Sequence, residues 1–279
     1  MSIPIVPGTL DRDGESLYYE CAGEANNPDV VVLCHGAGGN HAVWFEQVPE
    51  LALRYRVVTW DHRGFGMSTD RAGLSAPAVA TGDLAALLDH LGIESAHLVG
   101  QSMGGWTVLG LALAQPNRVR SLVLADSLGG CPVSGWIDRT LVAGRPDSGP
   151  MLGIHPAIGP RLHAEDPTRV YLYQLLGGFG RGTGGGIAPS VMRGLTETMH
   201  ERAALARLAC PILCVVGSDD AIFPPAWVHA AAAMLPGALV VEIAGAGHSP
   251  YFESPAAWNT AVATFLAAAS QRAAPSTGP

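Results

Sequence analysis

Short apolar runs alternate along the chain with longer segments whose apolar residues recur at helical spacing. The short runs are rich in valine, leucine and isoleucine, which is typical of buried strands. Strands are expected at Leu17–Cys21, Val30–Cys34, Arg56–Trp60, Ala96–Val99, Ser121–Ala125, Ile212–Val216 and Leu239–Ile243. Helices are expected at Val43–Leu53, Ala78–Leu91, Met103–Ala114, Ala226–Met234 and Pro255–Ala268. This order predicts an α/β fold with a mostly parallel, doubly wound sheet flanked by helices.

The alternation breaks between Asp126 and Pro211. About 85 residues are too many for one crossover helix with its loops, so we expect a helical cap inserted into the core. Helices of this cap are expected at Trp136–Ala143, Pro167–Leu176 and Pro189–Arg207. The expected division is a core domain of residues 1–126 and 211–270, a cap of residues 127–210 and a frayed tail of residues 271–279.

Composition narrows the classes of function. The chain has 279 residues, of which 48% are hydrophobic and 14% charged, so it can bury one large core. All sixteen basic residues are arginines, which excludes P-loop ATPases and Schiff-base enzymes, because both need a lysine. The formal net charge of −8 argues against a nucleic-acid partner.

The cysteines and the N-terminal sequence indicate in which cellular compartment the protein is expected. The five cysteines are scattered, and Cys34 and Cys214 fall in expected buried strands, which is typical of a reduced protein. No basic segment followed by an apolar one opens the chain, and no apolar stretch reaches membrane-spanning length. We expect a cytoplasmic protein without a membrane anchor, and the sequence leaves its self-association open.

A candidate nucleophile lies in the pentapeptide Gly100-Gln101-Ser102-Met103-Gly104, between an expected strand and an expected helix. A serine hydroxyl is a weak nucleophile. It needs a tight strand-to-helix turn where a base can reach it and backbone N–H groups can receive an oxyanion. The two glycines have no Cβ and leave room for that turn. Ser102 is therefore the expected nucleophile.

A base and an acid are expected on later strand ends. His248 lies in a glycine-rich loop after an expected strand and is the candidate base. The acid should orient the imidazole, and Asp220 is preferred to Asp219 because it begins a turn of its own before the next helix. Asp126, at the end of another strand, is the rival. The chain order nucleophile, acid, histidine favours Asp220.

An oxyanion hole needs two backbone donors. One is expected from the N–H of Met103, at a helix N-terminus where the dipole favours negative charge. The other is expected from Ala37, whose flanking glycines Gly36 and Gly38 permit unusual dihedral angles.

These motifs together resemble the α/β-hydrolase fold family over nearly the whole chain. They are the turn His35-Gly36, the segment Asp61-His62-Arg63-Gly64-Phe65-Gly66-Met67-Ser68, the elbow from Gly100 to Gly105, the acid turn from Gly217 to Pro224, and Gly247-His248. The resemblance implies that Asp61 and Arg63 belong to a scaffold loop beside the site.

The expected reaction is hydrolysis of a carboxylic ester, including a lactone, with an apolar small-molecule substrate and an acyl-enzyme intermediate. The resemblance also allows hydrolysis of a carbon–carbon bond in a diketone-like substrate, or a ligand-binding role with little turnover. A carboxylate-bearing diketone would need a cap arginine facing Ser102. The candidates are Arg139, Arg145, Arg169, Arg181 and Arg193.

Aromatic and glycine-rich positions complete the picture of the pocket. Trp136, Phe179 and Phe223 are expected to bind substrate. The tryptophans at expected helix positions belong in the core: Trp44, Trp106, Trp227 and Trp258. The glycine run 177–186 neither follows a strand nor opens a helix, so it predicts a hinge or lid tip and no dinucleotide site. Without a CxxC or HExxH pattern, we expect neither metal nor cofactor.

Overall fold

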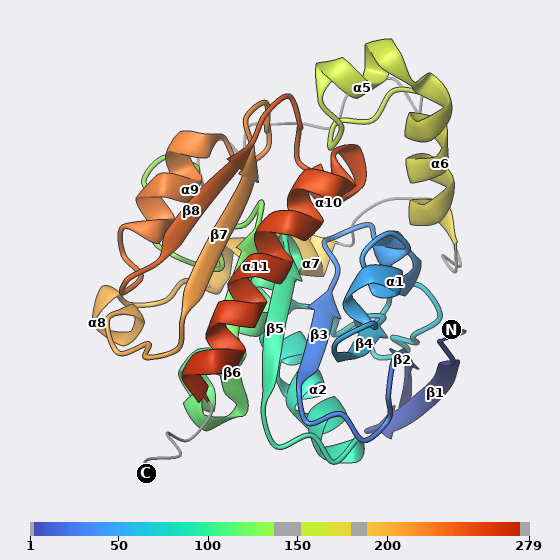
Figure 1. Cartoon of the computed structure of the whole chain (residues 1–279), viewed down its shortest axis with the longest axis vertical. Coiled ribbons are helices and arrows are strands. Elements are labelled where there is room, and N and C mark those ends of the chain that lie inside the picture. The colour runs from blue at the N-terminus through green and yellow to red at the C-terminus, as the bar shows by residue number, and fades with distance from the viewer. Residues whose placement is uncertain (1–2, 137–151, 180–188, 274–279) are drawn as a thin grey trace.

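The computed structural model describes residues 3–136, 152–179 and 189–273. Eight strands form one sheet in these residues, in the order β1-β2-β4-β3-β5-β6-β7-β8 (Figure 1). The strands are β1 (Ile5–Arg12), β2 (Glu15–Ala22), β3 (Val30–Cys34), β4 (Arg56–Trp60), β5 (Ala96–Gln101), β6 (Val119–Ala125), β7 (Ile212–Gly217) and β8 (Leu239–Ile243). Strands β3 to β8 pair in parallel, whereas β1 and β2 are antiparallel. The mostly parallel sheet is confirmed, and each predicted strand lies within an observed one.

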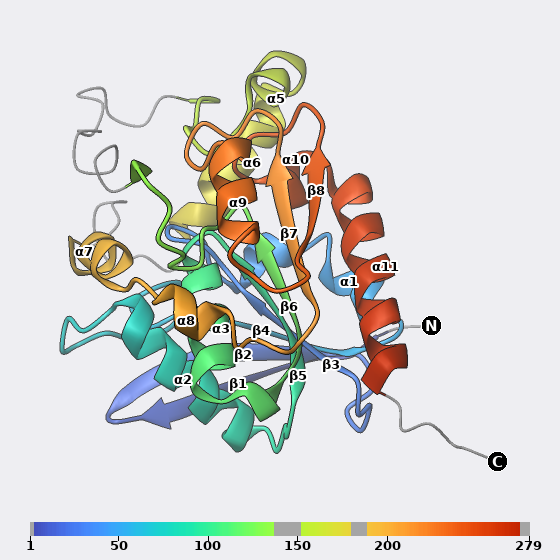
Figure 2. The same ribbon diagram turned by 90° about the vertical axis from the view of Figure 1, so that its left-hand side faces the viewer.

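Apolar side chains cover both faces of the sheet because successive strand residues point to opposite sides. On β3, Val32 belongs to one buried cluster and Leu33 to the other. The first cluster includes residues of α2 (Pro77–His90), α3 (Met103–Ala114) and α9 (Pro225–Ala232). The second includes residues of α1 (Val48–Leu51) and α11 (Pro255–Ala273). Figure 2 shows the sheet between these two helical layers, as predicted for a doubly wound fold.

The prediction misses the edge strand β1. Its side chains are mostly exposed, and Pro7 and Gly8 interrupt the apolar pattern. A turn signal was nevertheless present, because Asp13 and Gly14 join β1 to β2 with φ angles of 56° and 79°. Asp-Gly is the dipeptide that a two-residue hairpin turn of this kind favours.

The predicted helix Val43–Leu53 is broken. The chain forms a short 3-10 helix η1 (His41–Trp44) and then α1, with Pro49 in the first turn of α1. Proline has no N–H to donate to the preceding turn, so one continuous helix cannot run through this position.

The predicted helix Pro189–Arg207 is broken as well, into α7 (Pro189–Glu197) and α8 (Arg202–Leu205). Between them two hydrogen bonds run to residues outside this segment. The N–H of His200 donates to the carbonyl of Gly130 at 2.8 Å, and the Trp106 indole donates to the carbonyl of Thr198 at 3.1 Å. Hydrogen bonds with residues distant in the sequence therefore end α7.

Helices α5 (Pro160–Glu165), α6 (Pro167–Gly178), α7 and α8 all fall between β6 and β7, where the insertion is predicted. Helices α5 and α6 lie beyond the carboxyl ends of β7 and β8, next to the short helix α10 (Pro250–Glu253) (Figures 1 and 2). Of the expected helix Trp136–Ala143, only Trp136 is among the described residues. No helix in the described ranges is long and apolar enough to span a bilayer.

A buried ion pair joins the loop after β4 to α2. The Arg63 guanidinium donates to both carboxylate oxygens of Asp83, with distances of 3.0 Å from Nε and 2.8 Å from Nη2. The side chains are only 6% and 2% exposed. Asp83→Ala leaves the guanidinium buried without this partner and should lower the free energy of unfolding by about 3–5 kcal/mol, measured by urea denaturation.

The control for that prediction is the double variant Arg63→Met with Asp83→Leu, which removes both charges and keeps apolar volume. It should be more stable than Asp83→Ala alone. A double variant less stable than the single one would show that the cost comes from lost packing and not from the unpaired charge.

Candidate active site

Ser102 lies on the turn between β5 and α3, with φ 49° and ψ −117°. L-residues rarely adopt a positive φ, so neighbouring contacts must hold this turn. The Ser102 N–H donates to the Ala125 carbonyl at 2.9 Å, and the Ser102 carbonyl accepts from Ser127 Oγ at 2.7 Å. A Cβ on Gly104 would collide with the carbonyl oxygen of Cys34, so glycine is what lets α3 approach the end of β3.

His248 and Asp220 form a hydrogen-bonded chain with Ser102. The imidazole Nε2 lies 2.9 Å from Ser102 Oγ, and Nδ1 lies 2.8 Å from Asp220 Oδ2. The other carboxylate oxygen of Asp220 accepts the N–H groups of Ile222 and Phe223 at 2.8 and 2.9 Å. His248 and Asp220 are buried, so these hydrogen bonds lie largely out of water.

The two other aspartates considered from the sequence lie differently. Asp219 is exposed, and its carboxylate accepts a hydrogen bond from Ser218 Oγ at 3.1 Å. Asp126 is fully buried at the end of β6, where its Oδ1 accepts the N–H of Gly217 at 2.9 Å. Asp220 is the one whose carboxylate hydrogen-bonds the imidazole.

Glu253 fastens the histidine loop to α5. Its Oε1 accepts the N–H groups of Gly247 and Ser249 at 2.9 and 3.2 Å, and its Oε2 accepts the N–H of Gly159 at 2.8 Å. Burial raises the pKa of Glu253, and the three N–H donors oppose that shift. The same side chain thus holds the residues on both sides of His248 and the start of α5.

The two segments predicted to supply oxyanion donors both lie beside Ser102. Met103 is the first residue of α3, so its N–H has no preceding turn to bond and sits at the positive end of the helix dipole. The Ala37 segment is adjacent, because a Cβ on Gly36 would lie only 3.0 Å from the Ser102 Cβ. Both predicted donor segments therefore abut the serine.

His35 shapes the turn that carries Ala37. Its Nε2 accepts the N–H of His62 at 3.0 Å, so its Nδ1, 2.8 Å from the Gly36 carbonyl, is the protonated nitrogen. Burial, together with neighbouring His35, lowers the pKa of His62 well below its ordinary value. Two neutral imidazoles in edge-to-face contact, with centroids 4.4 Å apart, therefore pack behind this turn.

An aromatic cluster borders the imidazole. The Phe223 ring lies 5.4 Å from the His248 ring and packs on Trp106 and Trp136, with centroids 5.9 and 6.0 Å away. Phe223 and Trp136 are both buried and together form one wall beside the His248 imidazole. Trp106, predicted as a core residue, belongs to the same wall. Phe179 is 58% exposed at the end of α6.

A carboxylate oxygen of Asp126, one of Asp220 and an imidazole nitrogen of His248 lie within 4.8 Å of one another. Both nitrogens of the imidazole already have hydrogen-bond partners, Asp220 on one side and Ser102 on the other. We therefore assign this cluster to hydrogen bonding and not to a cation.

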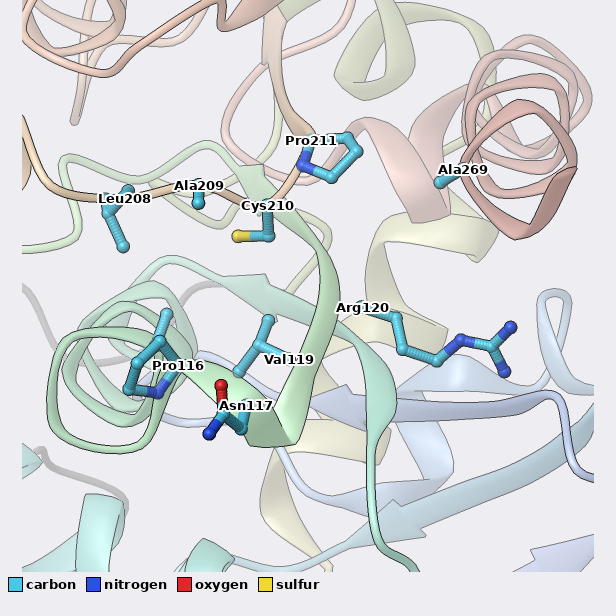
Figure 3. A pocket seen from close by; sticks show the side chains of 10 residues that line it. Pro116, Asn117, Val119, Arg120, Leu208, Ala209, Cys210, Pro211 and Ala269 are labelled. Carbon is cyan, nitrogen blue, oxygen red and sulfur yellow. The ribbon is translucent and has the colours of Figure 1, made fainter. Parts of the chain in front are cut away.

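A cavity of about 460 Å³ lies at the opposite end of the sheet from Ser102. It is lined by the start of β6, residues 208–211 before β7 and Ala269 of α11 (Figure 3). Neither the serine nor the histidine contributes to it, so this cavity is separate from the candidate site.

The cap features predicted from sequence are partly visible. Arg169 does not extend freely toward Ser102, because its guanidinium contacts Glu46 and donates to the Phe252 carbonyl. Arg193 is exposed on α7. Three further arginines lie outside the described residues: Arg139, Arg145 and Arg181. Of the glycine run, Gly177 and Gly178 end α6, and residues 180–186 lie outside the described ranges.

Sequence reasoning missed three residues that support the site, namely Ser127, Glu253 and Gln101. The side-chain amide of Gln101 donates to the His248 carbonyl at 2.9 Å and so joins the elbow to the histidine loop. Its place next to the candidate nucleophile was a usable signal. Ser127 and Glu253 carry no local signal, because their partners lie far away in the sequence or in a neighbouring loop.

Family models match both parts of the chain. A model described as alpha/beta hydrolase fold matches residues 29–151, and one described as TAP-like protein matches residues 193–277. A Caulobacter sp. (strain K31) protein named "Putative carbamate hydrolase RutD" is 31% identical over 93% of this chain and 97% of its own length.

Solved structures are similar over nearly the whole chain. The enol-lactonase from Burkholderia xenovorans LB400 has a TM-score of 0.79 at 26% identity, covering 93% of this chain and 100% of its own. A thermophilic esterase from Thermogutta terrifontis has a TM-score of 0.77 at 26% identity, covering 96% and 99%. With the family match and the sheet order described above, these similarities show that the chain belongs to the alpha/beta hydrolase superfamily.

Proposed function

We propose that this protein is a serine hydrolase that cleaves carboxylic esters, lactones included, through Ser102, His248 and Asp220. The observation that carries the proposal is the unbroken hydrogen-bonded chain from Ser102 Oγ through the imidazole to the Asp220 carboxylate. A serine without an adjacent base is a poor nucleophile, whereas this arrangement gives its proton a path to Nε2.

In the proposed mechanism, Ser102 Oγ attacks the carbonyl carbon while His248 Nε2 takes its proton. The resulting oxyanion accepts hydrogen bonds from the N–H groups of Ala37 and Met103. The imidazolium, stabilised by Asp220, then protonates the leaving alcohol oxygen, and an acyl-enzyme remains. His248 next takes a proton from water, whose oxygen attacks the acyl carbon, and finally returns a proton to Ser102. No step requires a cofactor.

The substrate class follows from the surroundings of the site and from the relatives. The wall of Phe223 and Trp136 beside the imidazole favours a small or medium apolar acyl group. Similar structures include an esterase and an enol-lactonase. A carboxylate-bearing substrate of the carbon–carbon alternative would need an arginine that faces Ser102, and Arg169, one candidate in the described residues, is engaged with Glu46 and Phe252 instead.

We further propose that residues 127–210 act as a cap, with residues 1–126 and 211–270 as the core. Helix α6 is joined to the core by Asn40, whose side-chain amide donates to the carbonyl of Leu176 on α6 at 2.6 Å. Phe179, at the end of the same helix, is the residue we propose for contact with the outer part of the substrate.

The first test is hydrolysis of p-nitrophenyl esters of increasing acyl length, with Ser102→Ala as the comparison. We expect turnover in the wild type and a loss of at least about 10³-fold in Ser102→Ala, because the nucleophile is absent. Substantial activity in the variant would reject Ser102. No ester turnover, with Ser102 still labelled by a phosphonate, would favour the carbon–carbon or the binding alternative.

The acid can be tested with two adjacent aspartates. Asp220→Asn should lower kcat/KM by about 10³-fold or more. An amide carries no negative charge to stabilise the imidazolium, and it does not hold the same imidazole tautomer. Asp219→Asn is the matched control, because its carboxylate is exposed, and should stay within about twofold. Equal losses of kcat/KM in the two variants would contradict the assignment of Asp220.

The tether through Glu253 gives a separate prediction. In Glu253→Gln, the amide oxygen can still accept from Gly247 and Ser249, but the amide NH₂ would face the N–H of Gly159. An unsatisfied buried N–H should lower the free energy of unfolding by about 1–3 kcal/mol, and loosening of α5 should raise KM more than it lowers kcat.

Urea denaturation and ester kinetics measure these two effects. Glu165→Gln is the control, because Glu165 belongs to α5, the helix that Glu253 holds, and its side chain is 61% exposed. If both variants behave like the wild type, Glu253 does not tether the cap.

A further inference from the structure

A second buried carboxyl group lies beside the proposed acid. Asp126 follows β6, next to β7 in the sheet, and has a positive φ of 46° (Figure 1). Its backbone N–H donates to the Val215 carbonyl at 2.7 Å, and its Oδ1 accepts the N–H of Gly217 at 2.9 Å. The side chain is fully buried, so β6 and β7 fix it in place away from water.

The remaining oxygen of Asp126 needs explanation. Its Oδ2 is buried and accepts a hydrogen bond from no donor among the described residues. A carboxylate oxygen of Asp126 lies within 4.8 Å of one of Asp220, whose own oxygens already accept N–H groups from His248, Ile222 and Phe223. Two ionised carboxylates cannot hydrogen-bond, since neither has a proton to donate. A hydrogen bond between these two buried carboxyl groups therefore requires that one of them holds a proton.

We propose that Asp126 is a positioning residue that keeps its proton and donates a hydrogen bond from Oδ2 to the Asp220 carboxylate. The inference rests on the proposed function, because it concerns the acid of the proposed triad. The proton stays on Asp126 throughout turnover. Its hydrogen bond holds the Asp220 carboxylate in the orientation that faces His248, and the site carries one negative charge instead of two.

The surroundings of Asp126 favour the neutral form. Burial raises the pKa of Asp126 well above its ordinary value of 3.8, the charge of Asp220 raises it further, and the N–H of Gly217 opposes the shift. Glu253 on α10 acts in the same direction as Asp220. The phenols of Tyr173 on α6 and Tyr251 on α10 are neutral neighbours. Two adjacent carboxyl groups in one buried site commonly share a proton in this way.

Folding thermodynamics provide a test that does not depend on activity. The unfolded chain releases the Asp126 proton near pH 3.8, whereas the folded protein keeps it, so folding takes up one proton above that pH. The contribution of this group to stability is therefore complete at low pH and declines as pH rises. Asp126→Asn has no proton to take up. The ratio of its folding equilibrium constant to that of the wild type should rise by up to tenfold for each unit of increase in pH.

The measurement is urea denaturation of the full chain at several values between about pH 4 and pH 8. Asp219→Asn, at an exposed aspartate, is the matched control, and its difference from the wild type should not change with pH above about 5. A difference for Asp126→Asn that is equally flat above about pH 5 would overturn the proposal, because it would mean that the folded protein carries Asp126 ionised.

Phosphonate labelling of Ser102 across the same pH range tests the positioning role. Asp126→Leu removes the donor and should slow labelling by about tenfold or more, whereas Asp126→Asn, whose amide can still donate to Asp220, should restore most of that loss. The acid limb of the pH profile should not move in Asp126→Asn. A displacement of about one pH unit or more would indicate that a negative charge had been removed beside the imidazole, and would overturn the proposal.

Failure of this inference and failure of the proposed function are distinguishable. A wild-type protein that neither hydrolyses esters nor reacts with a phosphonate rejects the proposed function, yet the denaturation series still reports whether Asp126 is protonated. Conversely, normal labelling combined with a flat stability difference rejects the shared proton and leaves the proposed triad standing.

Discussion

The strained turn at Ser102 is the constraint on which the rest of the site depends. A non-glycine residue at positive φ costs about 1–3 kcal/mol, so its surroundings must determine it fully. Here the Ala125 carbonyl, the Ser127 hydroxyl and the close approach of Gly104 to β3 hold the serine from three directions. The same turn begins α3, so the N–H of Met103 lies directly after the serine at the positive end of the helix dipole. The proposed nucleophile and one of the proposed oxyanion donors therefore depend on the same turn.

The parallel sheet then brings the remaining groups to that turn. In parallel strands the carboxyl ends lie at one edge, and each of β3, β5, β6, β7 and β8 ends there in a loop. The residues that follow these strands are Ala37, Ser102, Asp126, Asp220 and His248. Gathering them at one edge costs desolvation of several polar groups. Hydrogen bonds offset that cost, among them the three that Glu253 accepts.

Periodicity predicted what is local in this protein, and it failed where partners are distant. The buried strands are continuous apolar runs, so their positions could be predicted closely. The end of α7 could not, because it depends on hydrogen bonds from His200 to Gly130 and from Trp106 to Thr198. Glu253 was missed for the same reason, since nothing near it in the sequence indicates that it would bind Gly159. The edge strand β1 was missed although Asp13-Gly14 gave a local signal.

The two aspartates at the ends of β6 and β7 show where chain order stops being informative. Order favours Asp220 over Asp126 as the acid but says nothing of what the other carboxyl does. The number of hydrogen bonds that each carboxyl group accepts bears on the role of Asp126. Asp220 receives two backbone N–H groups and the imidazole, whereas Asp126 receives one backbone N–H and is more completely enclosed. Hydrogen-bond donors stabilise the charged form of a carboxyl group and burial disfavours it, so this arrangement supports the proposal that Asp126 is the carboxyl group that keeps a proton.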